Sequence, residues 1–150
     1  MAADTFILFT VAGTTYALRS RDVAHVEMVE QVTAVPNAAA FVDGVVFSRG
    51  VVVPALNLRA RFGFERASYD LATRMLVVHH GDRTVGLVVD GAREFAAIDP
   101  AAIQPPATAL SGLSGRYLEG VANLGDRLVL ILNLESVLTF SDSMLESQAH

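Results

Sequence analysis

Short runs of β-branched residues, each closed by glycine, aspartate or proline, constrain the fold of this chain most strongly. Valine occurs 20 times in the 150 residues. Such runs favour strands, and short strands at close spacing predict an all-β barrel or sandwich. We expect strands over ten segments: Phe6–Val11, Thr15–Leu18, Val26–Val29, Gly44–Phe47, Val51–Leu56, Met75–His80, Thr84–Val89, Arg93–Ala97, Leu118–Asn123 and Leu128–Asn133.

The connections between these strands are of two kinds. Gly13-Thr14, Gly81-Asp82 and Gly125-Asp126 each separate two apolar segments, where a hairpin needs a residue that tolerates positive φ. Asp99–Gly115 is longer and contains three prolines, so it is too broken for a strand or a long helix. We expect this segment to cross between the two halves of the β structure, and a loop of this length is often functional.

Helical structure is expected in only a few short pieces. Ser20–Ala24 is expected to form one turn with its first serine as the N-cap, and Leu58–Gly63 another turn that ends at glycine. Glu135–Phe140 predicts a short helix that packs Val137, Leu138 and Phe140 inward. Residues 141–150 are polar and are expected to form a frayed tail.

The composition excludes several classes of function. The net charge is −5 and the pI is about 5.2, which argues against nucleic acid as a partner. All eleven basic residues are arginine and there is no cysteine, so lysine and thiolate chemistry are excluded. No apolar run approaches the roughly 18 residues of a membrane-spanning helix, and the N-terminus lacks a basic start. We therefore expect a cytoplasmic protein without direct membrane insertion.

The remaining polar residues do not form a catalytic or metal-binding pattern. His79 and His80 are neighbours on a predicted strand, so their side chains point to opposite faces and do not share a metal. Gly112–Gly115 lacks the last glycine of a nucleophile elbow, because Arg116 stands in its place. Four carboxylates are expected at strand edges or turn tips, where water solvates them: Glu27, Glu30, Asp82 and Asp126. The sequence thus predicts no enzyme, no cofactor and no metal site.

The segment Phe41–Gly63 reads as strand, tight turn, strand and helical turn. Pro54 removes a ladder donor and therefore belongs at a sheet edge or a break. Arg49 is unusual, because it is a lone guanidinium between apolar residues and is followed by Gly50. One interpretation is that its stem covers the barrel with its charged head in water.

This segment resembles the CheW-like coupling proteins. Their pattern, hydrophobic-x-x-G-x-x-N-L-R-G-x-x-x-P-x-x-D-L, is matched at five positions: Gly44, Arg49, Gly50, Pro54 and Leu58. The similarity continues in order through four further segments: Arg74–Val78, Gly86–Asp90, Tyr117–Val121 and Gly125–Asn133. It covers about Phe6–Phe140, nearly the whole chain.

The resemblance implies one domain of two five-stranded, SH3-like β-barrel lobes around a shared apolar core. The first lobe would take residues about 14–80, and the second about 6–13 together with 81–140, with the N-terminal strand exchanged into it. The function implied is that of a non-catalytic adaptor, which docks on the regulatory domain of a CheA-like histidine kinase and on the cytoplasmic tip of a methyl-accepting chemoreceptor. At 150 residues the chain is expected to be the free-standing form.

Two binding surfaces follow from this expectation. The receptor surface would hold Val23, His25, Arg49 and Gly50, where Arg49 could hydrogen-bond acceptor groups of the receptor. The kinase surface would be the apolar strand edge around residues 29–35, with Val29, Val32 and Val35. The competing interpretations are that the valines are core residues, that Arg49 only covers the barrel, and that a backbone carbonyl satisfies a half-buried His25.

Four departures from the family pattern bear on which partners this chain serves. Phe47-Ser48 replaces Asn-Leu, Asn57 and Asn133 each replace an aspartate, and His25 replaces a frequent glutamate. An imidazole in place of a carboxylate changes the charge and adds a donor, which predicts that His25 helps to select the receptor. A rival function is a small-molecule-binding β-barrel with its ligand in the cleft between the lobes. A third possibility is a structural filler between kinases that does not touch receptors.

Overall fold

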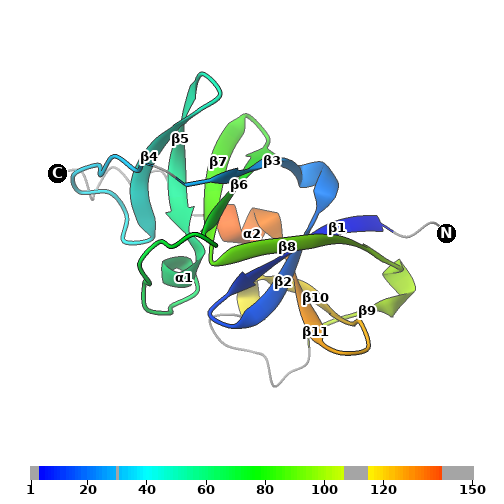
Figure 1. Ribbon diagram of the computed structural model, residues 1–150. Coiled ribbons are helices and arrows are strands. Elements are labelled where there is room, and N and C mark those ends of the chain that lie inside the picture. Colours follow the sequence, from blue (N-terminus) through cyan, green and yellow to red (C-terminus); the bar gives the residue numbers. More distant parts are fainter. Residues whose placement is uncertain (1–3, 30, 107–114, 140–150) are drawn as a thin grey trace.

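A computed structural model describes residues 4–29, 31–106 and 115–139 of the chain (Figure 1). Strands dominate and form two sheets. The six strands of one sheet are β1 (Asp4–Val11), β2 (Thr14–Arg19), β8 (Gly91–Ile98), β9 (Ile103–Gln104), β10 (Leu118–Asn123) and β11 (Leu128–Leu132). The five strands of the other are β3 (Val23–Met28), β4 (Val42–Ser48), β5 (Val51–Asn57), β6 (Arg74–His80) and β7 (Arg83–Val89). The described helical pieces are η1 (Ser20–Asp22), α1 (Leu58–Arg61), η2 (Pro100–Ala102), η4 (Gly115–Tyr117) and α2 (Leu134–Leu138).

All ten expected strands are present, and the all-β class is confirmed. The sheet orders are β8-β1-β2-β11-β10-β9 and β3-β6-β7-β5-β4. The N-terminal strand β1 lies between β8 and β2 in the six-stranded sheet. Among the described residues the ladders define open, strongly curved sheets rather than closed barrels, and the second lobe has six strands rather than five because β9 adds a two-residue edge.

The strand pairing places the boundaries between the two lobes at different residues from those expected. β2 pairs with β1 and β11, and therefore belongs to the second lobe together with β1. β7 pairs with β6 and β5, and therefore belongs to the first lobe. The chain crosses between the sheets at η1 and at Asp90, which separates β7 from β8. The expectation for Asp99–Gly115 was wrong, because the segment joins β8 to β10 within one sheet; its residues 107–114 lie outside the described part.

The two lobes repeat one local arrangement. β5 runs parallel to β7 and leads into α1, and β11 runs parallel to β2 and leads into α2. An asparagine at the end of each strand is the N-cap of the helix: Asn57 Oδ1 accepts from the N–H of Ala60, and Asn133 Oδ1 from the N–H of Ser136, each at 3.1 Å. The two asparagines that depart from the family pattern thus occupy equivalent structural positions.

The helical expectations are corrected in detail. Ser20 is the first residue of η1 rather than its N-cap, which is Arg19 and makes no side-chain capping bond. The C-terminal helix begins at Leu134 and ends at Leu138, with Val137 and Leu138 buried as expected. Phe140 and the expected tail lie outside the described residues. None of the helices in the described ranges combines the length and the apolar character that crossing a membrane requires.

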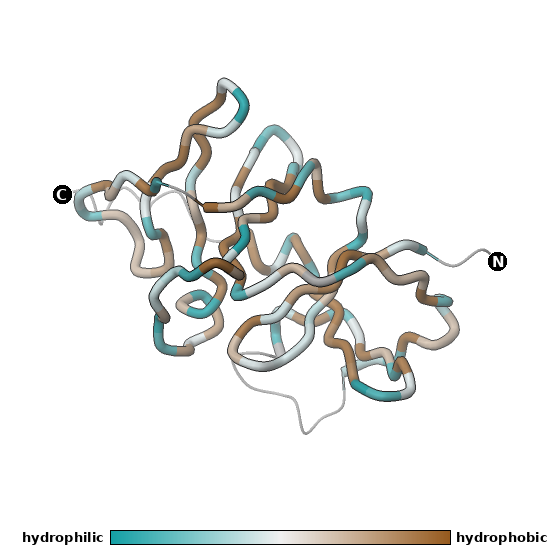
Figure 2. Tube along the Cα trace, in the orientation of Figure 1, coloured by the Kyte–Doolittle hydropathy of each residue, from teal (hydrophilic) through white to brown (hydrophobic). Residues whose placement is uncertain are grey.

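The apolar core has a shared part and a part within each lobe. Side chains of both sheets, such as Phe9 and Leu18 from one and Leu76 and Leu87 from the other, form one buried cluster. Figure 2 shows the corresponding hydrophobic stretches along the strands of both sheets. A second cluster lies within the six-stranded sheet, and a third smaller one within the five-stranded sheet. The expectation of a shared apolar core is therefore confirmed.

Four aromatic rings run through the shared core and tie the lobes together. Tyr16 lies between Phe9 and Phe62, with ring centroids 6.1 Å and 5.3 Å away, and Phe62 lies 5.3 Å from Tyr117. Phe62 follows α1 in the first lobe, whereas the other three rings belong to the second lobe or to η4. Such ring contacts contribute beyond the apolar area that they bury. The relative position of the two sheets is thereby fixed by packing.

Candidate functional site

The Arg-Gly motif forms the tip of the β4–β5 hairpin. Ser48 pairs with Val51, so the turn consists of Arg49 and Gly50 alone. Both residues have positive φ, 48° and 85°, which is the turn geometry that matches the twist of a hairpin. A Cβ on Gly50 would meet no atom within 4 Å, so the backbone angle rather than space favours glycine there. The turn presents the Arg49 side chain, which is 70% exposed.

Beneath this tip, a polar cluster links β3 to the end of β4. His25 Nε2 lies 3.2 Å from Ser48 Oγ, and both groups contact Oε2 of Glu27. Arg49 Nε lies 4.0 Å from the same carboxylate oxygen. Glu27 is therefore the common partner of the other three side chains. Its contacts contradict the expectation that water merely solvates this carboxylate.

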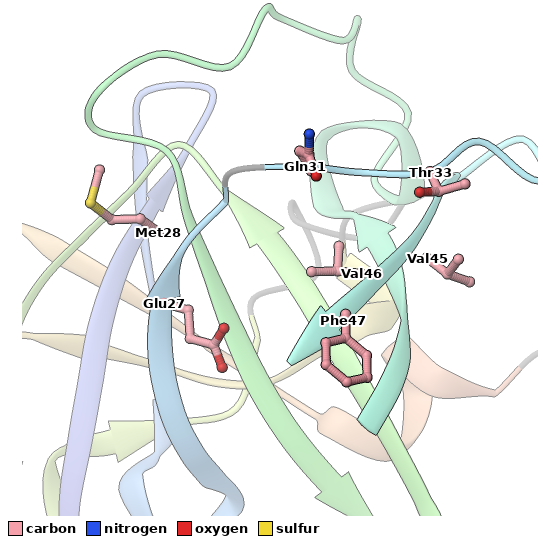
Figure 3. A pocket seen from close by; sticks show the side chains of 7 residues that line it. All are labelled: Glu27, Met28, Gln31, Thr33, Val45, Val46 and Phe47. Atoms are coloured by element: carbon pink, nitrogen blue, oxygen red, sulfur yellow. The ribbon is translucent and has the colours of Figure 1, made fainter. Parts of the chain in front are cut away.

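The cluster forms because β3 turns its polar side chains inward and its apolar side chains outward, the reverse of the usual half-buried strand. His25 and Glu27 are two residues apart, so their side chains share one face of the strand, and both are half-buried. Val26 and Met28 point to the other face and are exposed. Figure 3 shows Met28 directed away from Phe47, while Glu27 extends toward the space between β3 and β4. An edge strand with apolar side chains outward is a natural contact surface.

The same region holds a groove of about 510 Å³ (Figure 3). It opens between β3 and β4, the two edges of the five-stranded sheet. Its lining residues are Glu27, Met28, Gln31, Thr33, Val45, Val46 and Phe47. Phe47 is 73% exposed and pairs across the hairpin with Val52, which is 61% exposed. In Figure 2 the hydrophobic colour continues along the hairpin almost to its tip.

The expected receptor residues do not all take the same role. His25, Arg49 and Gly50 come together around Glu27 and the hairpin tip. Val23 is half-buried and packs against the shared core. His25 is half-buried as one interpretation held, but side chains of Ser48 and Glu27 contact its Nε2 rather than a backbone carbonyl. Neither Glu27 nor Ser48 was predicted as a site residue, although the period of two along β3 places Glu27 beside His25.

The expected kinase residues lie in an irregular segment rather than on an edge strand. β3 ends at Met28, and in the segment that follows Thr33 forms an isolated bridge with Val45. Val29 packs against the small core of the first lobe, and Val32 is half-buried, with its Cγ1 close to where a Cβ on Gly44 would lie. Val35 is 42% exposed. Two of the three valines are thus half-buried and one is exposed.

The polar groups around the hairpin tip do not have the arrangement of a catalytic triad. In a serine–histidine–carboxylate triad the hydroxyl and the carboxylate contact different ring nitrogens, but here Ser48 and Glu27 both contact Nε2 of His25. His79 bonds Thr84 and His80 lies 3.9 Å from Glu135, so the two rings have separate surroundings. Within residues 4–29, 31–106 and 115–139, no three histidine or carboxylate side chains are grouped closely enough to hold a metal ion.

Fold and site together define a binding module: two packed sheets, an exposed arginine on a hairpin tip, and exposed apolar side chains along the same hairpin. A model of the CheW-like domain matches residues 5–141, and the chain belongs to this family. A chemotaxis protein CheW of Klebsiella aerogenes is 32% identical over 140 residues, covering 93% of this chain and 84% of the relative. A chemotaxis protein CheW of Bacillus subtilis is 27% identical over 135 residues, covering 90% and 86%.

The solved structures agree with this assignment. The scaffolding protein TtCheW from Thermoanaerobacter tengcongensis superposes with a TM-score of 0.84 at 26% identity, covering 93% of this chain and 94% of that one. The chain is accordingly a non-catalytic adaptor of chemotaxis signalling. The rival function of a small-molecule-binding barrel is not favoured, and the groove lies within one sheet rather than between the lobes.

Proposed function

We propose that this chain joins the regulatory domain of a CheA-like histidine kinase to the cytoplasmic tip of a methyl-accepting chemoreceptor, and that it does so in the cytoplasm at receptor arrays. Relatives named as chemotaxis proteins and a neighbour described as a scaffold support this role. The observation that carries the proposal is the β4–β5 hairpin, where Arg49 stands among exposed Phe47, Val51 and Val52. Clustered exposed apolar side chains mark contact sites.

The receptor would bind at the hairpin tip and the adjoining β3, through Arg49, Gly50, His25 and Val23. Arg49 offers a planar guanidinium with several donors, which suits carboxylate or carbonyl acceptors on a helical receptor tip. Gly50 contributes the turn that presents Arg49, and Val23 supports β3 from the shared core.

The kinase regulatory domain would bind along the segment around Val29, Val32 and Val35. Val35 is the exposed member of the three and would make the direct contact. Val29 and Val32 would act by holding the segment in place, because they pack against the first lobe and against Gly44.

Separate binding measurements test the two surfaces. We expect Arg49→Ala to weaken binding of a chemoreceptor tip fragment while binding of the kinase regulatory domain and the melting temperature change little. Arg21→Ala is the matched control, because Arg21 is also an exposed arginine but lies in η1. Unchanged receptor affinity in Arg49→Ala, or a large fall in melting temperature with intact receptor-dependent kinase activation, would contradict the receptor surface.

Val35→Asp tests the kinase surface more cleanly than Val32→Asp, because Val32 is half-buried beside Gly44 and its replacement is expected to change stability as well. We expect Val35→Asp to weaken binding of the kinase regulatory domain and to leave the circular dichroism spectrum and receptor binding unchanged. Leu71→Asp is a control, since Leu71 is exposed between α1 and β6. A folded Val35→Asp variant with full kinase affinity would show that the kinase binds elsewhere.

A further inference from the structure

The two free edges of the five-stranded sheet are held together by side chains. β3 and β4 stand at opposite ends of the order β3-β6-β7-β5-β4. In the described residues no ladder joins these two strands directly; the nearest backbone link is the bridge from Thr33 to Val45. Glu27 on β3 and Ser48 at the end of β4 make a side-chain contact across this gap. The contact therefore ties the base of the hairpin tip to β3.

Both side chains that hold the Glu27 carboxylate are departures from the family pattern. Ser48 donates its hydroxyl hydrogen to Oε2, and His25 directs Nε2 at the same oxygen. The partners are half-buried or buried, which limits the freedom of the carboxylate.

Glu27 in turn faces the exposed arginine of the hairpin tip. Arg49 Nε lies 4.0 Å from Oε2, while most of the arginine side chain is in water. A charge at this distance biases a flexible side chain without burying it. An arginine that is already oriented loses less freedom on binding a partner.

We propose that Glu27 is the positioning residue of the hairpin tip: His25 and Ser48 fix its carboxylate, and the carboxylate orients the guanidinium of Arg49 toward the acceptor groups of a receptor tip. This proposal rests on the receptor-binding function proposed above. It assigns Glu27 a role in receptor affinity through Arg49, without contact of its own with the receptor.

The first test observes Arg49 without any partner. Glu27→Gln keeps the shape of the side chain and removes its charge. In nitrogen-15 spectra of the whole chain, we expect the Nε–H signal of Arg49 to shift in Glu27→Gln. Glu119→Gln is the matched control: Glu119 pairs with Arg19 in the other lobe, and its side chain is 29% exposed against 22% for Glu27. An Arg49 signal unchanged by Glu27→Gln would overturn the proposal.

The second test is a double-mutant cycle on binding of a helical-hairpin tip fragment from a chemoreceptor. We expect Glu27→Gln to weaken binding by up to roughly fivefold, the upper end for an exposed ion pair, and to have no effect in an Arg49→Ala background. Equal weakening in both backgrounds would show a general structural role and overturn the proposal. If the parent chain bound no tip fragment while the Arg49 signal still responded to Glu27→Gln, the receptor-binding function would fail and the Glu27–Arg49 coupling would stand.

Discussion

The side-chain amide of Asn57 donates a hydrogen bond from Nδ2 to Oδ2 of Asp43, with 2.8 Å between the two atoms. Asn57 is buried, and its Oδ1 caps α1 at the same time. Asp43 also accepts from Arg66 Nε at 2.8 Å and from the hydroxyl of Tyr69. The asparagine that departs from the family pattern is therefore matched to Asp43, since an aspartate there would set two carboxylates together.

Asn57→Asp, the return to the family residue, should destabilise this chain. The N-cap of α1 is kept, because aspartate is as good an N-cap residue as asparagine. The hydrogen bond that Nδ2 donates to Asp43 is lost, however, and a second negative charge is placed beside the Asp43 carboxylate. We expect the free energy of unfolding to fall by about 1–3 kcal/mol. Chemical denaturation measures it. Asn133→Asp is the matched control, because Asn133 caps α2 through the same Oδ1 bond; equal losses at the two positions would contradict the explanation.

A pH-dependent contribution to stability comes from Asp90, at the crossing between the lobes. Burial raises the pKa of this carboxyl, but hydrogen bonds from Arg59 and from the N–H of Ala12, together with the charge of Arg59, outweigh it and lower the pKa. Because the folded pKa lies below the unfolded one, the stabilisation is complete above the ordinary aspartate pKa of about 3.9. It is lost as the pH falls through the folded pKa.

Denaturation curves of the parent chain and of Asp90→Asn over this acid range check the effect. At neutral pH we expect the parent to be the more stable, and the difference to shrink as the pH falls below about 4. Asp126→Asn serves as the control, because the Asp126 side chain is 81% exposed in a turn. A difference between parent and Asp90→Asn that stays constant with pH would exclude Asp90 as the titrating group.

Arg61 joins α1 of the first lobe to α2 of the second. Its Nε donates to the carbonyl oxygen of Val137 at 2.9 Å, and Nη2 donates to that of Thr139 at 3.0 Å. The guanidinium also lies over the rings of Phe41 and Tyr117, at 4.7 Å and 5.0 Å from their centroids. A lysine side chain has neither the several donors that bond two carbonyl oxygens at once nor the planar group that packs over an aromatic ring. We expect Arg61→Lys to lower the free energy of unfolding by about 1–3 kcal/mol, measured by denaturation, against little change for Arg21→Lys.

The sequence predicted the strands well because their signal is local. Runs such as 6–11 and 75–80 are mostly apolar and contain β-branched residues, and a glycine turn follows each of them. The division of lobes was not predictable in this way, because the parallel pairing of β2 with β11 joins residues far apart in the chain. β9 was missed because two residues between prolines carry no periodicity.

The candidate site was predicted in part. Arg49 and Gly50 follow from the motif, and their place at a hairpin tip follows from a turn between two apolar runs. Glu27 was missed because a pattern of apolar residues around it suggests that the apolar face is the buried one. β3 does the opposite, since Val26 and Met28 are exposed while Glu27 lies under the hairpin tip. Which face of such a strand is buried, the polar or the apolar one, is known only when the strands that pack beside it are known.

The effect of His25→Glu, which also restores the family residue, is expected to depend on Glu27. His25 Nε2 contacts the Glu27 carboxylate, so a glutamate at position 25 would place a second carboxylate on the same face of β3, next to Ser48. Repulsion would push Glu27 away from Arg49 and reduce stability, by about 1–2 kcal/mol. We therefore expect the single exchange to weaken binding of the cognate receptor tip without gain toward a tip from an ordinary swimming-chemotaxis system.

The double exchange His25→Glu with Glu27→Gln restores a single carboxylate. Glutamate at position 25 could then take over the interaction with Arg49 from the same face, and Ser48 would still offer a hydroxyl. We expect this variant to regain stability in chemical denaturation and to shift preference toward the swimming-chemotaxis tip in paired titrations of the two tips. If the single exchange alone moved the preference and the second change added nothing, His25 would select the receptor directly, independently of Glu27.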